Sequence, residues 1–301
     1  MLLKNGKVSL FPCGVVLLSA WLMFTTACHK GRGIQTDPVA VSTSAGGEGG
    51  ETAAPEPGED GQLLVRYREA VEAAKYPTAS KIARDLTPIS LDNPDLHWND
   101  QGQVLMVTWT DSKWYPEKKG ESFHLDVDTW FTAYPYMHVF CSEFQGGDLS
   151  LRIAQSLGLP PDTRKGDFVH VWVSPEFIFR PCPDPEIYDS QCLVRIPLLN
   201  KSAAIGEKDG PPWYCEAGPP PIQTGQAFLW VRQTHLDWMC ANWEKSYSGD
   251  DPLKQYPWTA LGYTYDWGNP RDPVGFSEYV VLKNTTVVFE SKTPTATYCG
   301  R

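Results

Sequence analysis

One histidine and two acidic residues in the C-terminal half of the chain have side chains suited to acid–base chemistry. His235 lies in a segment with helical apolar spacing, Gly225–Tyr247, and Asp266 and Glu278 follow it. An imidazole acts as a general base when a carboxylate orients it, so these three are the candidate catalytic residues of a hydrolase. However, His235 falls on an apolar stripe of its helix, where a hydrogen-bonded core histidine is the commoner arrangement. The sequence contains no G-x-S-x-G or H-E-x-x-H motif, and it favours a binding protein over an enzyme.

Five large aromatic residues lie within the twelve residues 256–267. Flat rings of this kind stack on the faces of sugars, and the threonine and aspartate side chains between them can bind hydroxyl groups. We therefore predict a ligand-binding face for carbohydrate, composed of Trp258, Tyr263, Tyr265 and Trp267. The alternative is a strand in which Tyr263 and Tyr265 alternate with polar residues, while the rings belong to the core.

A proline-rich acidic loop extends from Arg180 to Cys192. Its alternating prolines hold the chain extended, and a disulfide between Cys182 and Cys192 would close it. Clustered carboxylates can coordinate a hard cation such as Ca²⁺. The candidate ligands are Asp184, Glu186 and Asp189. The spacing of an EF-hand is absent, so the alternative is a rigid structural loop in which Arg180 pairs with one of the acids.

Six cysteines lie beyond residue 30, and their even number indicates disulfides formed in an oxidising compartment. Proximity in the sequence favours the pairs Cys182–Cys192 and Cys215–Cys240, which leaves Cys141–Cys299 as the third. With all six paired, no thiol remains for catalysis. The close cysteine and histidine pairs of a zinc site are absent, so we predict neither a metal centre nor a cofactor.

A secretory signal is predicted for residues 1–27. Two lysines precede an apolar run that is strongest at 15–24, and the small residues Thr25-Thr26-Ala27 lead to Cys28. This ending resembles the lipobox of bacterial lipoproteins. The resemblance implies that the signal is cut before Cys28 and that fatty acyl chains, palmitate among them, are attached to this cysteine. An uncut membrane anchor and ordinary signal cleavage after Ala27 are the alternatives.

The same resemblance predicts where the protein resides. A lipoprotein is anchored on the extracytoplasmic side of the bacterial cell envelope, in the periplasm or at the cell surface, and the membrane is its partner through the lipid on Cys28. His29 after this cysteine resembles lipoproteins sorted to the outer membrane of Gram-negative cells. The formal net charge of −10 provides no basic surface, so no nucleic-acid partner is expected. The sequence gives no indication of an oligomeric state.

The chain is divided by composition into a tether and a folded part. Residues 28–62 are expected to be the anchor cysteine and a disordered linker, because 20 of the 32 residues in 31–62 are Gly, Pro, Ser, Thr or Ala and none is aromatic. Such a segment buries too little apolar area to offset its ordering entropy. Residues 63–301 are long enough for a single globular domain with a substantial core.

Apolar periodicity predicts an α+β fold for this domain. Helices are expected at 63–76, at 225–247, and after Asp148 as a capping residue with Gly158 at the end. Strands are expected at 104–110, 168–173, 279–282 and 286–289, the last two as a hairpin. With no regular helix between successive strands, the sheet should be mainly antiparallel, with long loops rich in proline and glycine around it.

The tether, the cysteines and the aromatic-rich C-terminal half lead to one functional interpretation. The sequence predicts a lipid-anchored extracytoplasmic domain that acts by binding, with carbohydrate as the ligand class. One alternative is an extracytoplasmic hydrolase that uses His235 with an acidic partner. The other is a structural envelope protein without a small ligand.

Overall fold

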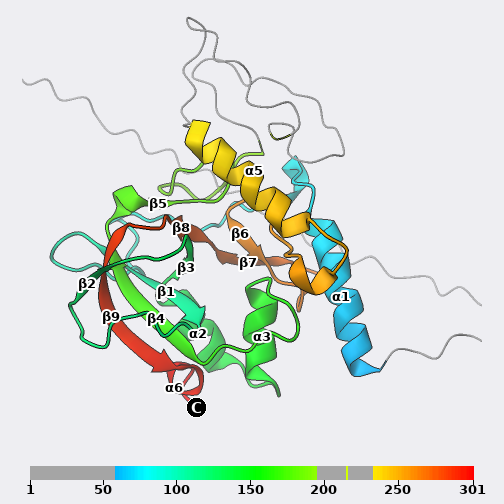
Figure 1. Cartoon of the computed structure of the whole chain (residues 1–301), viewed down its shortest axis with the longest axis horizontal. Coiled ribbons are helices and arrows are strands. Elements are labelled where there is room, and N and C mark those ends of the chain that lie inside the picture. Colours follow the sequence, from blue (N-terminus) through cyan, green and yellow to red (C-terminus); the bar gives the residue numbers. More distant parts are fainter. Residues whose placement is uncertain (1–57, 195–214, 216–232) are drawn as a thin grey trace, which may run out of the picture. The chain divides into compact units, whose positions relative to one another are not determined.

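A seven-stranded antiparallel sheet organises the chain, and a few helices and long loops surround it (Figure 1). The computed structural model describes residues 58–194, residue 215 and residues 233–301. In spatial order the strands are β2 (Ser122–His124), β9 (Thr286–Pro294), β4 (Asp167–Val173), β1 (Val104–Thr110), β3 (Thr129–Ala133), β8 (Tyr279–Val281) and β5 (Ile178–Phe179). The fold class is therefore α+β, as the sequence pattern predicts.

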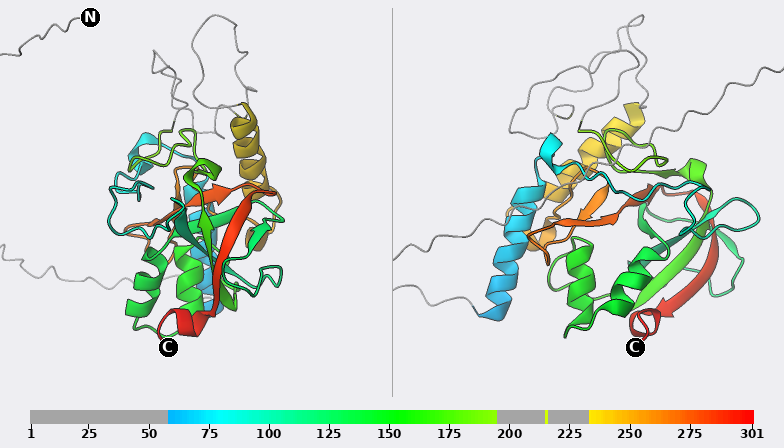
Figure 2. Two further views of the ribbon diagram at one scale, coloured as in Figure 1. Left: turned by 90° about the vertical axis from the view of Figure 1, so that its left-hand side faces the viewer. Right: turned by 180° about the vertical axis from the view of Figure 1, so that it is seen from behind.

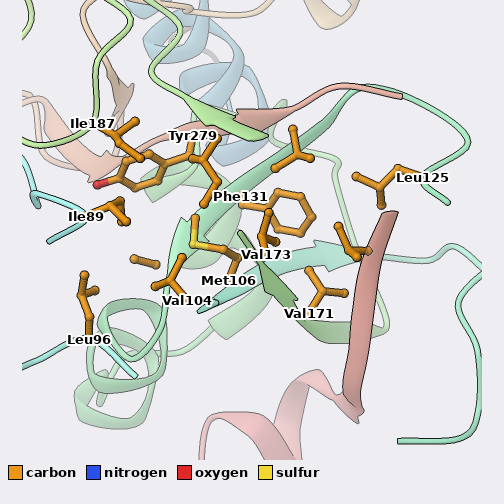
Figure 3. Close-up of a cluster of buried hydrophobic side chains, with 14 of the residues drawn as sticks. Ile89, Leu96, Val104, Met106, Leu125, Phe131, Val171, Val173, Ile187 and Tyr279 are labelled. Carbon is orange, nitrogen blue, oxygen red and sulfur yellow. The ribbon is translucent and has the colours of Figure 1, made fainter. Parts of the chain in front are cut away.

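One face of this sheet carries a large apolar cluster (Figure 3). Met106 on β1 lies opposite Val171 on β4, so the two-residue period of a strand places both side chains on the same face. The buried members on the central strands are Val104, Met106, Phe131, Ala133, Val169, Val171, Val173 and Tyr279. The β-branched and apolar residues of the predicted strands thus form the main core.

The predicted hairpin at 279–289 is wrong. β8 pairs with β3 and β5, whereas β9 pairs with β4 and β2. The turn between them, with Asn284 at a φ of 67°, does not fold β9 back on β8, because its backbone bonds to Leu125 instead. The antiparallel register is the same on both sides of this turn, because Thr129 pairs with Val281 and His124 pairs with Thr286. β2–β3 and β8–β9 therefore form one bent ribbon that joins the two sides of a curled sheet.

Helices cover the opposite face and the ends of the sheet. The longer ones are α1 (Glu59–Ala74), α2 (Tyr136–Glu143), α3 (Leu149–Ser156) and α5 (Gln233–Tyr247), and a short α6 (Thr295–Tyr298) follows β9. Three 3-10 turns lie between them, at η1 (Ala79–Lys81), η2 (Pro175–Phe177) and η3 (Pro252–Lys254). The carboxylate of Asp148 accepts a hydrogen bond from the backbone N–H of Leu151, which confirms its predicted capping role.

A two-stranded sheet and two long helices form the other end of the domain. The sheet pairs β6 (Tyr263–Tyr265) with β7 (Val274–Ser277). Helix α1 packs near α5, where the indole N–H of Trp243 donates to the carbonyl oxygen of Lys75 at 3.2 Å (Figure 2). Residues 225–232 of the predicted third helix lie outside the described residues.

Three disulfides staple these elements together. They join Cys182 to Cys192, Cys215 to Cys240, and Cys141 to Cys299, the pairings that sequence proximity predicts. The third ties α2 to the residue after α6 across a sequence separation of 158. Disulfides of this number are typical of proteins that fold outside the reducing cytosol.

The N-terminal predictions fall on residues outside the described part of the chain, namely the signal at 1–27, the lipid site Cys28 and most of the linker. The linker boundary is corrected at its C-terminal end, because α1 already begins at Glu59 rather than at residue 63. In the described ranges, no helix combines the length and the apolar character needed to cross a bilayer. The described residues belong to one compact unit.

Candidate functional site

A cavity of about 360 Å³ lies between the helix-covered face of the sheet, α5 and the loop before β6. We call it the Glu278 cavity. Its aromatic lining is Trp109, Trp130, Phe131, Phe168, Tyr256, Trp258 and Tyr265. Its polar lining is Thr108, Thr132, Asn242, Lys245, Ser246, Thr264 and Glu278. Of the lining residues, Lys245 and Tyr256 are the exposed ones, so they mark its rim. Concave, mainly apolar spaces of this size with a few polar groups are typical of small-molecule sites.

The position of Glu278 follows from the junction of two strands. It is the residue between β7 and β8, and its backbone N–H donates to the carbonyl oxygen of Gly262 at 3.0 Å. Tyr263, the next residue after Gly262, pairs with Ser277 in the small sheet. These two links hold Glu278 against the loop that carries Trp258.

The carboxyl of Glu278 is buried without a hydrogen-bond partner for its Oε1 atom in the part of the chain that the structure describes. Burial raises the pKa of Glu278 to about 8, and the indole N–H of Trp258, which faces it, acts in the opposite direction. The Nε1 atom of Trp258 likewise lacks a hydrogen bond to any described residue. Most buried polar groups in proteins are paired, so two unpaired neighbours in one cavity are unusual.

Three tryptophans form a cluster behind this carboxyl. The ring of Trp130 lies edge-on to that of Trp258 at a centroid distance of 6.0 Å, and Trp238 lies 5.8 Å from Trp130. Trp238 also donates from its indole nitrogen to Asp128 at 2.8 Å. Burial removes water from Glu278, which is the physical cause of the raised pKa.

Of the three predicted catalytic residues, Asp266 and His235 are each paired with a different group, whereas Glu278 Oε1 has no hydrogen bond from a described residue. The carboxylate of Asp266 accepts two hydrogen bonds from the Arg152 guanidinium, at 2.8 and 2.6 Å, in a buried ion pair. His235 donates from Nε2 to the carbonyl oxygen of Cys182 at 2.8 Å, and burial lowers the pKa of its imidazole. Within the described ranges, no hydrogen bond or ion pair connects His235 with Asp266 or Glu278. Only Glu278 lines the cavity.

The predicted aromatic face is divided between the cavity and the core. Trp258 and Tyr265 line the Glu278 cavity. Tyr263 is buried and donates from its hydroxyl to the carbonyl oxygen of Lys81 at 2.8 Å. Trp267 is also buried, and its indole donates to the carbonyl oxygen of Leu159 at 2.9 Å. Tyr263 and Tyr265 both lie in β6, as the strand alternative predicts, and the ligand-binding role of Trp258 and Tyr265 stays a prediction.

The acidic loop is arranged around a buried arginine. The guanidinium of Arg180, whose side chain has no exposed surface, donates to Asp189 Oδ1 at 2.9 Å and to the carbonyl oxygens of Thr87 and Gln191. Burial raises the pKa of Asp184 to about 6, with a further increase from the nearby Asp189. Burial also raises the pKa of Glu186, although its carboxylate accepts a hydrogen bond from the Tyr188 backbone.

This geometry corresponds to the structural alternative for the loop, because Asp189 is already neutralised by a cation of the protein. Across the described residues, no group of three or more histidine, cysteine or acidic side chains is placed to hold a metal ion.

Sequence reasoning missed a cluster of histidines around Tyr134. The centroids of His97, His138 and His170 lie 4.7, 6.1 and 5.4 Å from that of Tyr134. Burial lowers the pKa of His170 to about 4. The three histidines come from segments far apart in the sequence, so no local spacing predicts that they form a cluster. The sheet tryptophans of the cavity were missed for the same reason.

Comparison with known proteins adds no relative to these observations. No protein-family model, curated protein or solved structure matches this chain significantly.

Proposed function

We propose that this protein binds a small saccharide in the Glu278 cavity and thereby acts as a binding domain of an extracytoplasmic surface. The observation that carries the proposal is an aromatic-lined cavity with two buried polar atoms, Glu278 Oε1 and Trp258 Nε1, that have no hydrogen bond to a residue of the described ranges. Aromatic rings supply stacking area for the faces of a sugar, and unpaired polar atoms gain hydrogen bonds when hydroxyl groups arrive. The threonine and asparagine side chains of the lining offer further hydroxyl contacts.

The test is calorimetric titration of the purified, oxidised protein with a panel of neutral and charged monosaccharides and disaccharides. Tyr265→Ala removes a half-buried ring from the cavity wall and should weaken binding about tenfold or more. Trp114→Ala is the matched control, because this ring is 81% exposed and lies outside the lining. Equal binding by wild type and Tyr265→Ala, or no binding to any saccharide at millimolar concentration, would contradict the proposal.

A second candidate is catalysis of glycoside hydrolysis with Glu278 as general acid. A protonated buried carboxyl beside a tryptophan is suited to that role. Hydrolysis of a glycoside ordinarily requires a second carboxyl across the scissile bond, and Glu278 is the only acidic residue among the described lining. The binding function is therefore preferred. Turnover of aryl glycosides that disappears in Glu278→Gln would reverse this preference.

We also propose that Cys28 carries the lipid that anchors the domain. The residues Thr25-Thr26-Ala27-Cys28 support this proposal through their resemblance to a lipobox, and the three disulfides support export. The test is metabolic labelling with palmitate in a bacterial host, where Cys28→Ala should remove the label. Unlabelled wild-type protein that retains its first 27 residues would indicate an uncut anchor, and unlabelled protein in the medium would indicate ordinary secretion.

A further inference from the structure

Among the described residues that line it, the Glu278 cavity has a buried acid but no buried base. Two arginines with little or no exposed surface are already paired with acids of the protein, Arg152 with Asp266 and Arg180 with Asp189. Lys245 is the one basic residue among the described lining, and it lies exposed at the rim. A carboxylate formed at Glu278 therefore has no counter-ion from the described residues inside the cavity. Buried carboxylates are otherwise paired with a cation, so a ligand is the remaining source of one.

The walls of the cavity are also suited to a cation. Trp258, Trp130, Tyr256 and Tyr265 present aromatic rings to the same space. The face of an aromatic ring attracts an ammonium group, and tryptophan does so most strongly. This attraction increases where water is excluded, as it is beside the tryptophan cluster. In addition, the net charge of −10 on the chain favours the approach of cations at long range.

We infer that the ligand of the Glu278 cavity is a sugar that carries a free amino group, whose ammonium ion pairs with the Glu278 carboxylate and lies against the ring of Trp258. This inference rests on the proposed saccharide-binding function and specifies its ligand class. The hydroxyl groups of the sugar would then contact the threonine, serine and asparagine side chains of the lining. The ammonium would supply the counter-ion that the cavity lacks.

Binding of this kind releases a proton. Free Glu278 is protonated at pH 7, because its buried carboxyl has a pKa of about 8. When the ammonium binds, the carboxyl loses its proton to solvent and the ion pair forms, so each bound ligand displaces one proton. Affinity should therefore increase about tenfold from pH 6 to pH 7.

The buried tyrosines around Glu278 keep their protons over this pH interval. Burial raises the pKa of Tyr247 and Tyr263, which interact electrostatically with Glu278, and that of Tyr265 in the lining. Tyr256 and Lys245 complete the titratable lining at the rim. A proton released between pH 6 and pH 7 would consequently report on Glu278.

The experiment compares three probes that differ at one position: glucosamine, N-acetylglucosamine and glucose. Wild-type protein should bind glucosamine about ten times more tightly than the two uncharged sugars at pH 7, and only glucosamine should show the pH dependence. Titrations in two buffers with different ionisation enthalpies measure the proton release directly. Glu278→Gln should lose the preference for glucosamine and the proton release.

The control variant is Glu244→Gln, an exposed acid on α5 outside the cavity, which should behave as wild type. A thermal unfolding midpoint for Glu278→Gln at or above that of wild type shows that this variant is folded. Equal affinity of the wild type for glucosamine and glucose overturns the inference and leaves the proposed function intact. Absence of binding for all three sugars, together with all other saccharides tested, overturns both.

Discussion

Arg180 and Glu278 are both buried ionisable residues, but their surroundings differ in one respect. The guanidinium of Arg180 donates hydrogen bonds to Asp189, Thr87 and Gln191, and only its Nε atom is unpaired. The carboxyl of Glu278 has an unpaired oxygen and lies beside an unpaired indole, in a cavity of about 360 Å³. A buried group with protein partners stabilises the fold, whereas a buried group with empty space beside it is available to a ligand.

The surroundings of Arg180 and of Glu278 meet at Gly262, so a substitution there affects both. Its carbonyl oxygen accepts the hydrogen bond from the Glu278 backbone. On its other side, a Cβ atom added to Gly262 would lie 2.6 Å from the Sγ atom of Cys192. The closed loop therefore supports the strand junction that positions Glu278.

The largest effect is expected for Arg180→Met. The variant removes the guanidinium that donates to the carbonyl oxygens of Thr87, Asp189 and Gln191 and pairs with the Asp189 carboxylate. The free energy of unfolding should therefore fall by about 3–4 kcal/mol. The measurement is urea unfolding of the oxidised protein. Arg164→Met is the control, because its ion pair with Asp148 is exposed and should contribute about 0–1 kcal/mol. Similar losses in the two variants would contradict the structural role of Arg180.

Gly262→Ala should have the next largest effect. Gly262 has a φ of 75°, and the added methyl group would collide with the Cys182–Cys192 disulfide. We expect a loss of about 3 kcal/mol and weaker binding in the cavity, because Glu278 is displaced.

Gly102→Ala separates the strain of a positive φ from the collision with the disulfide. Its φ is 72°, but no atom lies within 4 Å of the added Cβ, so it should lose only about 1 kcal/mol. Equal stability of the two alanine variants would show that the loop does not constrain Glu278.

Glu278→Gln should stabilise the protein in a pH-dependent manner. The pKa of Glu278 is raised to about 8 in the folded protein, so the folded state keeps a proton that the unfolded state has lost above its ordinary pKa of 4.5. Wild-type stability should therefore fall by about 1.4 kcal/mol per pH unit from about pH 4.5 to about pH 8, relative to the variant. At pH 7 the variant should be more stable by about 3 kcal/mol, and at pH 4 the two should be equal. Urea unfolding at pH 4, 6 and 8 measures this, and a constant difference at all three would refute it.

The smallest effect is expected for His235→Gln, whose amide can still donate to the Cys182 carbonyl oxygen. We expect a change of about 1 kcal/mol at pH 7.5 and unchanged saccharide binding. Burial lowers the pKa of His235 in the folded state, so wild-type stability decreases as the pH falls below 6.5, and the variant should lose this acid sensitivity. Loss of ligand binding or of a hydrolytic activity in His235→Gln would instead restore His235 as a functional residue.

The sequence predicts those features that depend on local spacing. The strand at 104–110 coincides with β1, and the capping aspartate begins α3 where the apolar period starts. Two disulfides follow from proximity along the chain, and Cys141–Cys299 follows as the remaining pair. These predictions succeed because one stretch of residues contains the whole signal.

Features that depend on distant residues were not predictable in the same way. The turn at Lys283-Asn284-Thr285 is a normal hairpin signal, but the bonds to Leu125 redirect β9 to a different neighbour. Similarly, the cavity combines Trp109 and Trp130 from the sheet with Ser246 from α5 and Glu278 from a strand junction. The sequence indicates Glu278 as a candidate acid–base residue. Its burial, and the lack of a hydrogen bond from a described residue to its Oε1 atom, depend on the tertiary structure.

The bent ribbon also determines when the sheet can be completed during synthesis. β1, β3 and β4 leave the ribosome well before β8 and β9, which belong to the last part of the chain, from Tyr279 onward. Until that part arrives, β3 and β4 have open edges whose backbone groups can pair with another molecule. A chain that stops before Tyr279 should therefore aggregate rather than fold into a smaller domain.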